Sequence, residues 1–70
     1  MFHVTPYTAA IRVIAPGYKP GQVEAFIRCE HSTLDGLSYT QFVNEIRLAC
    51  LCIDKAGPAM SARIAASFGL

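Results

Sequence analysis

The residues most capable of chemistry in this 70-residue chain lie in two short motifs, Cys29-x-His31 and Cys50-x-Cys52. Thiolates and imidazoles are the usual ligands of zinc, so the two motifs together hold enough donors for one ion. Residues two positions apart on a helix, however, point about 200° apart, so Cys50 and Cys52 should diverge. We therefore expect buried structural cysteines and no bound metal, with a zinc-stabilised domain as the less favoured alternative.

Enzymatic chemistry finds little support in the other residues. A cysteine nucleophile needs a nearby base, and His31 would serve only if the fold brought it close. The sequence also has no glycine-rich phosphate loop. The acidic residues are typical of ion pairs, loops and helix caps: Glu24, Glu30, Asp35, Glu45 and Asp54. We predict a protein that is not an enzyme and that uses neither a cofactor nor a small-molecule substrate.

The composition describes one small and unusually apolar domain. Hydrophobic residues make up 53% of the chain and charged residues 16%, which argues against a disordered tail. A domain of this length buries only about 60% of the surface that its unfolded chain exposes. The excess of apolar residues therefore predicts a surface that is buried in an assembly or in an oligomer.

Charge, hydropathy and cysteine count further limit the class of protein and the partners that it can have. The formal net charge of +1 gives no long-range attraction to nucleic acid, which argues against an autonomous RNA binder but not against an assembly subunit. No apolar run approaches the ~20 residues that span a membrane, so no membrane partner is expected. Three cysteines are an odd number, which favours free thiols in a reducing compartment over a disulfide scaffold.

The strongest structural pattern lies in residues 36–54, where a helix start, a helical period and a stop signal agree. Ser38 and Gln41 have the spacing of a capping box, in which each side chain bonds to the other residue's backbone. Asp54 is expected to end this central helix. Apolar residues recur along one stripe of it: Phe42, Val43, Ile46, Ala49, Cys50 and Ile53.

The opposite face of the central helix changes character along its length. Its first half carries Thr40, Asn44 and Arg47, whereas its second half carries Leu48 and Leu51. A small free monomer should not expose such apolar residues together. Either another helix of the same chain or a partner molecule is expected to cover them, and Leu48 and Leu51 are therefore candidate partner-binding residues.

Residues 1–19 form an N-terminal arm that contains no acidic residue. Thr5 and Pro6 have the types expected at an N-cap and a first helical position, which predicts a short helix over about 6–14. An acid-free, amphipathic N-terminus that carries Arg12 is also typical of a mitochondrial targeting segment. The arm is expected to be either an uncleaved address or a packed element of the fold.

Residues 20–70 are expected to form the helical domain. One helix should run from Pro20 to about His31, and another should follow Pro58 and stop near Gly69. In the last helix the residues at every fourth position should face inward: Met60, Ile64 and Phe68. The prediction is an all-α fold, a small bundle of three to four short helices. Its expected core contains Phe26, Phe42, Ile46, Ile53 and Ile64, with Leu34 inserted from a loop.

The segment GLSYTQFVNEIRLACLCIDK, residues 36–55, resembles the C-terminal globular domain of the bacterial-type large-subunit ribosomal proteins of the L-twenty family. That family carries a motif close to G-L-S-Y-S-x-F-I-N-x-L-x-x-A-x-I-x-I-D-R-K. The matching residues here are Gly36, Leu37, Ser38, Tyr39, Phe42, Asn44, Ala49, Ile53 and Asp54. The chain departs from the family in lacking its long basic N-terminal extension and the basic-apolar run that follows the motif.

The resemblance implies a structural constituent of the large ribosomal subunit that stabilises ribosomal RNA beside neighbouring ribosomal proteins. The residues that it places at the RNA are Arg28, Ser38, Tyr39, Thr40, Asn44, Arg47 and Lys55. The low charge and short length point to a mitochondrial ribosome, with another organellar or a cytoplasmic ribosome as the alternative location. The alternative function is a small helical protein–protein interaction module, either a homodimer or an assembly subunit, without RNA.

Overall fold

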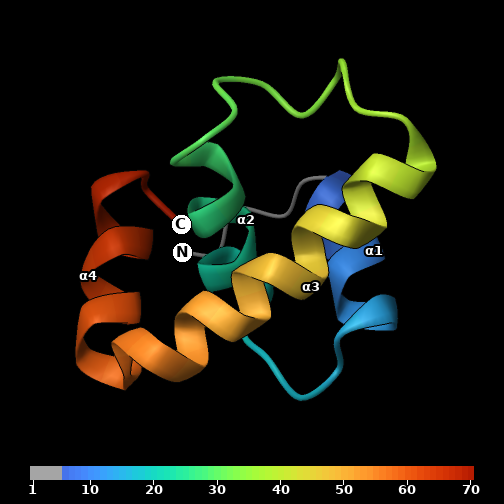
Figure 1. Ribbon diagram of the computed structural model, residues 1–70. Helices are drawn as coiled ribbons and strands as arrows, with labels where there is room; N and C mark the ends of the chain where they lie inside the picture. Colours follow the sequence, from blue (N-terminus) through green and yellow to red (C-terminus); the bar gives the residue numbers. More distant parts are fainter. Residues whose placement is uncertain (1–5) are drawn as a thin grey trace.

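The computed structural model describes residues 6–70, which form four α-helices (Figure 1): α1 (Pro6–Ile14), α2 (Pro20–Arg28), α3 (Tyr39–Ala56) and α4 (Pro58–Ser67). These residues contain no β-strand, so the predicted all-α bundle is confirmed. The helix predicted over 6–14 is confirmed as well, whereas its expected N-cap, Thr5, lies outside the described residues. None of the described helices combines the length and the apolar character needed to cross a membrane.

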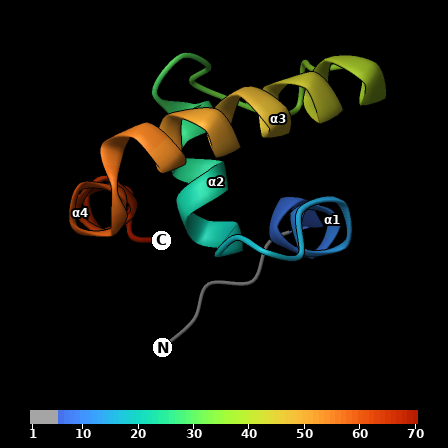
Figure 2. The same ribbon diagram turned by 60° about the horizontal axis from the view of Figure 1, so that its bottom comes forward.

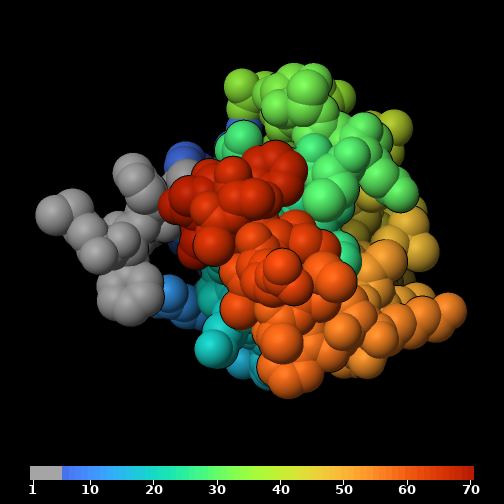
Figure 3. Space-filling model, turned by 90° about the vertical axis from the view of Figure 1, so that its left-hand side faces the viewer, coloured from blue at the N-terminus to red at the C-terminus, as the bar shows by residue number. Residues whose placement is uncertain are grey.

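Helix α2 lies at the centre of the bundle and contacts the three other helices. Figures 1 and 2 show α3 crossing over α2, with α1 on one side of α2 and α4 on the other. Figure 3, which looks at the molecule from the α4 side, shows α4 in front, where it covers most of α2 from view, and the two helices are in contact. This central position leaves Val23 and Ala25 fully buried and Ile27 only 1% exposed.

A single hydrophobic cluster joins α1, α2 and α3 beneath this crossing. Leu34 inserts into it from the loop after α2, as predicted, and is 3% exposed. The cluster is dominated by branched aliphatic side chains, whose burial removes apolar area from water and drives folding. Its buried members are Ile11, Ala15, Val23, Ile27, Leu34, Phe42, Ile46 and Ala49.

The predicted core was only partly correct. Phe42 and Ile46 are buried, as expected, at 9% and 1% exposure. Phe26 and Ile53 only pack against the edge of the cluster, and Ile64 is half-buried. The core therefore lies closer to α1 and α2 than the sequence pattern predicted, because α2 and not α3 is surrounded by the other helices.

Helix α3 begins at the predicted capping box and ends two residues later than predicted. The Ser38 hydroxyl accepts a hydrogen bond from the Gln41 N–H at 3.2 Å, and the Gln41 side chain accepts one from the Ser38 N–H at 2.9 Å. Asp54 lies inside the helix, so its predicted role as the stop is wrong. The end is set instead by Gly57, whose φ of 87° and ψ of 167° turn the chain into Pro58.

Helix α2 ends at Arg28 and not near His31, as had been predicted. The N–H groups of Glu30 and His31 both donate to the Ile27 carbonyl, at 3.1 and 3.0 Å, and this tight turn closes the helix. Beyond it, the Thr33 hydroxyl accepts a hydrogen bond from the N–H two residues on, at 3.2 Å. The loop therefore begins earlier than the apolar pattern indicated, and this side-chain bond stabilises a turn within it.

The inward face of α4 is shifted by one position from the prediction. Met60 and Phe68 are 47% and 43% exposed, and Ile64 is half-buried. The buried residues are Ser61 at 0% and Ala65 at 6%. Small side chains allow the close approach of α4 to α2, which a row of large apolar residues would prevent.

The glycine that separates α3 from α4 provides a test of these helix ends. We expect Gly57→Ala to lower the free energy of unfolding by about 1–3 kcal/mol, because this backbone conformation is open almost only to glycine. Gly36→Ala is the matched control, since its new Cβ would meet no atom within 4 Å and its φ is not positive. Urea denaturation followed by circular dichroism measures both, and equal effects would contradict the assignment.

Candidate functional site

One side of α3 points away from the rest of the bundle and carries most of the predicted site residues. At 3.6 residues per turn, six of its positions fall within a sector about 100° wide. All six are exposed, and they are called the outer face of α3 below: Thr40, Asn44, Arg47, Leu48, Leu51 and Lys55. The opposite sector is buried in the core through Phe42, Ile46 and Ala49.

The two leucines of the outer face lie bare on the surface of the bundle. Leu48 is 53% exposed and Leu51 is 59% exposed. Of the two alternatives drawn from the sequence, cover by another helix of the same chain is therefore wrong for the described residues. Two large aliphatic residues at i and i+3 on an exposed helix face are the arrangement by which helices insert into grooves of partner proteins.

An apolar groove of about 520 Å³ lies beside the outer face of α3. Four of its lining residues belong to α3, and most of the others belong to the turn between α1 and α2. Tyr18 belongs to this lining, and its hydroxyl donates to the Asp54 carboxylate, whose two oxygens lie 2.8 and 3.0 Å away. This hydrogen bond raises the pKa of Tyr18 above its usual value of 10.0, because it favours the protonated phenol. The lining residues are Ile14, Ala15, Pro16, Gly17, Tyr18, Ile46, Arg47, Cys50 and Leu51.

The start of α3 contributes a second exposed segment. Tyr39 is 74% exposed, so its ring is accessible to a binding partner. The Ser38 hydroxyl is engaged in the capping bond, which makes its first role the stabilisation of the helix. No acidic residue lies in the first turn of α3, so nothing in that turn neutralises the positive end of the helix dipole.

Arg28, a predicted RNA-binding residue, forms an ion pair within α2. Its Nε donates to the Glu24 carboxylate at 2.9 Å, and the two residues of the pair have i,i+4 spacing. The Glu24 side chain is completely buried, whereas that of Arg28 is 32% exposed. The guanidinium therefore stabilises a buried carboxylate, and the structure does not bring it together with the outer face of α3.

The cysteines do not form the predicted buried set. Cys29 and Cys52 are exposed, and only Cys50 is half-buried. Burial and the nearby Asp54 carboxylate raise the pKa of Cys50, which disfavours a reactive thiolate. Cys50 and Cys52 lie on different faces of α3, as helical spacing predicts.

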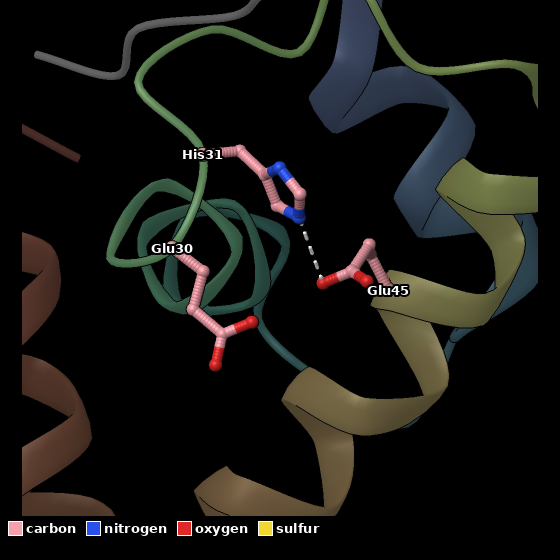
Figure 4. A group of neighbouring side chains, drawn as sticks. All are labelled: Glu30, His31 and Glu45. Carbon is pink, nitrogen blue, oxygen red and sulfur yellow. Dashed lines mark ion pairs between the residues drawn. The ribbon is translucent and has the colours of Figure 1, made fainter.

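Sequence reasoning missed the one group of potential metal ligands that the described residues bring together. Ligand atoms of Glu30, His31 and Glu45 all lie within 4.8 Å of one another (Figure 4). The His31 Nε2 atom lies 3.4 Å from a Glu45 carboxylate oxygen. Only the adjacency of Glu30 and His31 was visible in the sequence, because Glu45 reaches them solely through the packing of α3 beside the end of α2.

Comparisons with models of protein families, with curated proteins and with solved structures found no match to this chain. The resemblance of residues 36–55 to the L-twenty ribosomal proteins therefore stays a prediction. The outer face of α3, with the groove beside it, is the candidate binding site on geometric grounds alone.

Because Arg28 is paired with Glu24, we expect it to contribute to the stability of the fold and not to binding. We expect Arg28→Met to lower the free energy of unfolding by about 1.5–3 kcal/mol, the usual contribution of a hydrogen bond to a charged group. Arg47→Met removes the same charge from the exposed outer face and should change stability by less than about 0.5 kcal/mol. Chemical denaturation measures both, and an unaffected Arg28→Met protein would show that the pair contributes nothing.

Proposed function

We propose that this protein is a non-catalytic interaction module that binds another protein through the outer face of α3. The observation that carries the proposal is the exposure of Leu48 and Leu51, at 53% and 59%, beside an apolar groove. A chain that leaves such residues uncovered has apolar area available to a partner. Removing that area from water contributes about 25 cal/mol of favourable free energy per Å² of apolar surface buried.

The charges around the leucines describe the partner surface. Arg47 precedes Leu48, and Lys55 lies one turn beyond Leu51, so two cations flank the apolar centre. A complementary partner presents an apolar pocket for the leucines and carboxylates near the cations. Such charges mainly direct orientation and specificity, whereas the buried apolar anchors supply most of the affinity.

We propose a role as a structural constituent of the large ribosomal subunit as the second candidate function. It is supported by the motif resemblance and by the common face that Thr40, Asn44, Arg47 and Lys55 share, with Tyr39 exposed at its end. In this case cations contact phosphates, Tyr39 stacks on a base, and neighbouring ribosomal proteins cover the leucines. The expected location is then a mitochondrial ribosome.

The two candidates differ in which substitutions release the protein from its complex. We expect Leu48→Ser/Leu51→Ser to weaken the complex at least about tenfold, because the apolar anchors are lost. Val13→Ser is the matched control, since Val13 is 81% exposed on α1 and lies outside the outer face of α3. Sedimentation of the tagged full chain from cell extract, with and without ribonuclease, is the measurement.

The outcomes separate the functions. A complex that survives ribonuclease and is lost in the double leucine variant supports the protein-binding module. Co-sedimentation with a large ribosomal subunit that ribonuclease abolishes, and that Arg47→Gln/Lys55→Gln weakens more than the leucine variant, supports the ribosomal function instead. A monomer that sediments alone in both conditions contradicts both.

A further inference from the structure

We propose that Glu30, His31 and Glu45 form a binding site for a first-row divalent metal ion such as Zn²⁺. The site lies apart from the outer face of α3, and its existence does not depend on the function proposed above. It joins the turn that closes α2 to the middle of α3, two segments that are far apart in the sequence (Figure 4). Together the three side chains offer one imidazole nitrogen and two carboxylate groups.

The backbone holds two of these ligands in place. The N–H groups of Glu30 and His31 both donate to the Ile27 carbonyl, at 3.1 and 3.0 Å, so the turn that carries them is fixed. Glu45 lies within α3, whose start is secured by the Ser38 capping box. The side chains of His31 and Glu45 are 34% and 20% exposed, so both are partly immobilised by their surroundings.

The distance between His31 and Glu45 suits a shared metal ion better than a direct bond. Their Nε2 and Oε1 atoms are 3.4 Å apart, which is long for an N–H···O hydrogen bond. Two ligands on a tetrahedral zinc ion with bonds of 2.0–2.1 Å are separated by about 3.3 Å. An ion can therefore be held by these two atoms with almost no movement of either element.

Glu30 completes the site by a small rotation of an exposed side chain. Its carboxylate lies within 4.8 Å of the other two ligand atoms, so closing the set needs a shift of about 1.5 Å. Two carboxylates that face each other repel, and a divalent cation between them removes that repulsion. Three protein ligands leave the fourth position of a tetrahedral ion to water.

The donor set also selects the class of metal. An imidazole ligand suits zinc and neighbouring transition ions, whereas Ca²⁺ and Mg²⁺ prefer sites built wholly from oxygen. The cysteines are not members of the cluster, so the site differs from the cysteine-based zinc site weighed from the sequence. An ion held here would tether α2 to α3 and so restrain the intervening loop that carries Leu34.

The test is Zn²⁺ binding measured by competition with a chromophoric chelator on the full chain carrying Cys29→Ser and Cys52→Ser. These changes remove the two exposed thiols that would otherwise compete for the ion. In this background we expect one Zn²⁺ per chain, with affinity reduced at least about tenfold by His31→Gln and by Glu45→Gln, because each change removes a ligand. Asp35→Asn is the matched control, because it removes a carboxylate from the same loop outside the cluster.

A second measurement keeps the result independent of folding defects. Co²⁺ absorption should report a tetrahedral site without thiolate bands, and Zn²⁺ should raise the melting temperature of the parent chain but not of the Glu45→Gln variant. Circular dichroism confirms that each variant is folded. No saturable Zn²⁺ binding, or binding that His31→Gln and Glu45→Gln leave unchanged, would overturn the proposal.

Discussion

The structure depends on the burial of α2, a helix of only nine residues that has to contact each of the others. A chain of 70 residues has too little apolar area for two cores, so its helices share one. Val23 and Ile27 of α2, at 0% and 1% exposure, meet Ile11 of α1 and Ile46 of α3 in that core. Because α1 and α4 lie on opposite sides of α2, both depend on α2 and on the overlying α3 for their packing.

The central position of α2 also explains why one of its charged residues, Glu24, is buried, which costs desolvation free energy. Glu24 is completely buried, and a carboxylate in such a place requires partners that replace water. Arg28 supplies one of them from the next turn of the same helix, at 2.9 Å. Glu24 belongs to an i,i+4 ion pair of the kind usually found on a solvated helix face. It is buried here because the neighbours of α2 also cover the side of the helix that carries it.

Local signals in the sequence predicted the helices well, but they did not predict which residues of different helices lie close together. The Ser38–Gln41 capping box acts within four residues, so its spacing alone identified the start of α3. The stop at Asp54 was wrong because Gly57 and Pro58 constrain the backbone more strongly than an acidic side chain does. The burial of Ser61 in place of Met60 reflects how closely α4 approaches α2, which no helical period encodes.

The same reasoning explains why α3 carries both candidate sites. Its 18 residues span about 27 Å, twice the length of α2, so the other helices can bury only one side of it. The side toward the end of α2 brings Glu45 to Glu30 and His31, and the side away from the bundle exposes Leu48 and Leu51. The exposed leucines were predictable from the period of α3, because they depend on one helix. The Glu30–His31–Glu45 cluster was not predictable, because it forms only when α3 packs beside the turn that closes α2. The spacing of residues along one helix carries no information about such a contact.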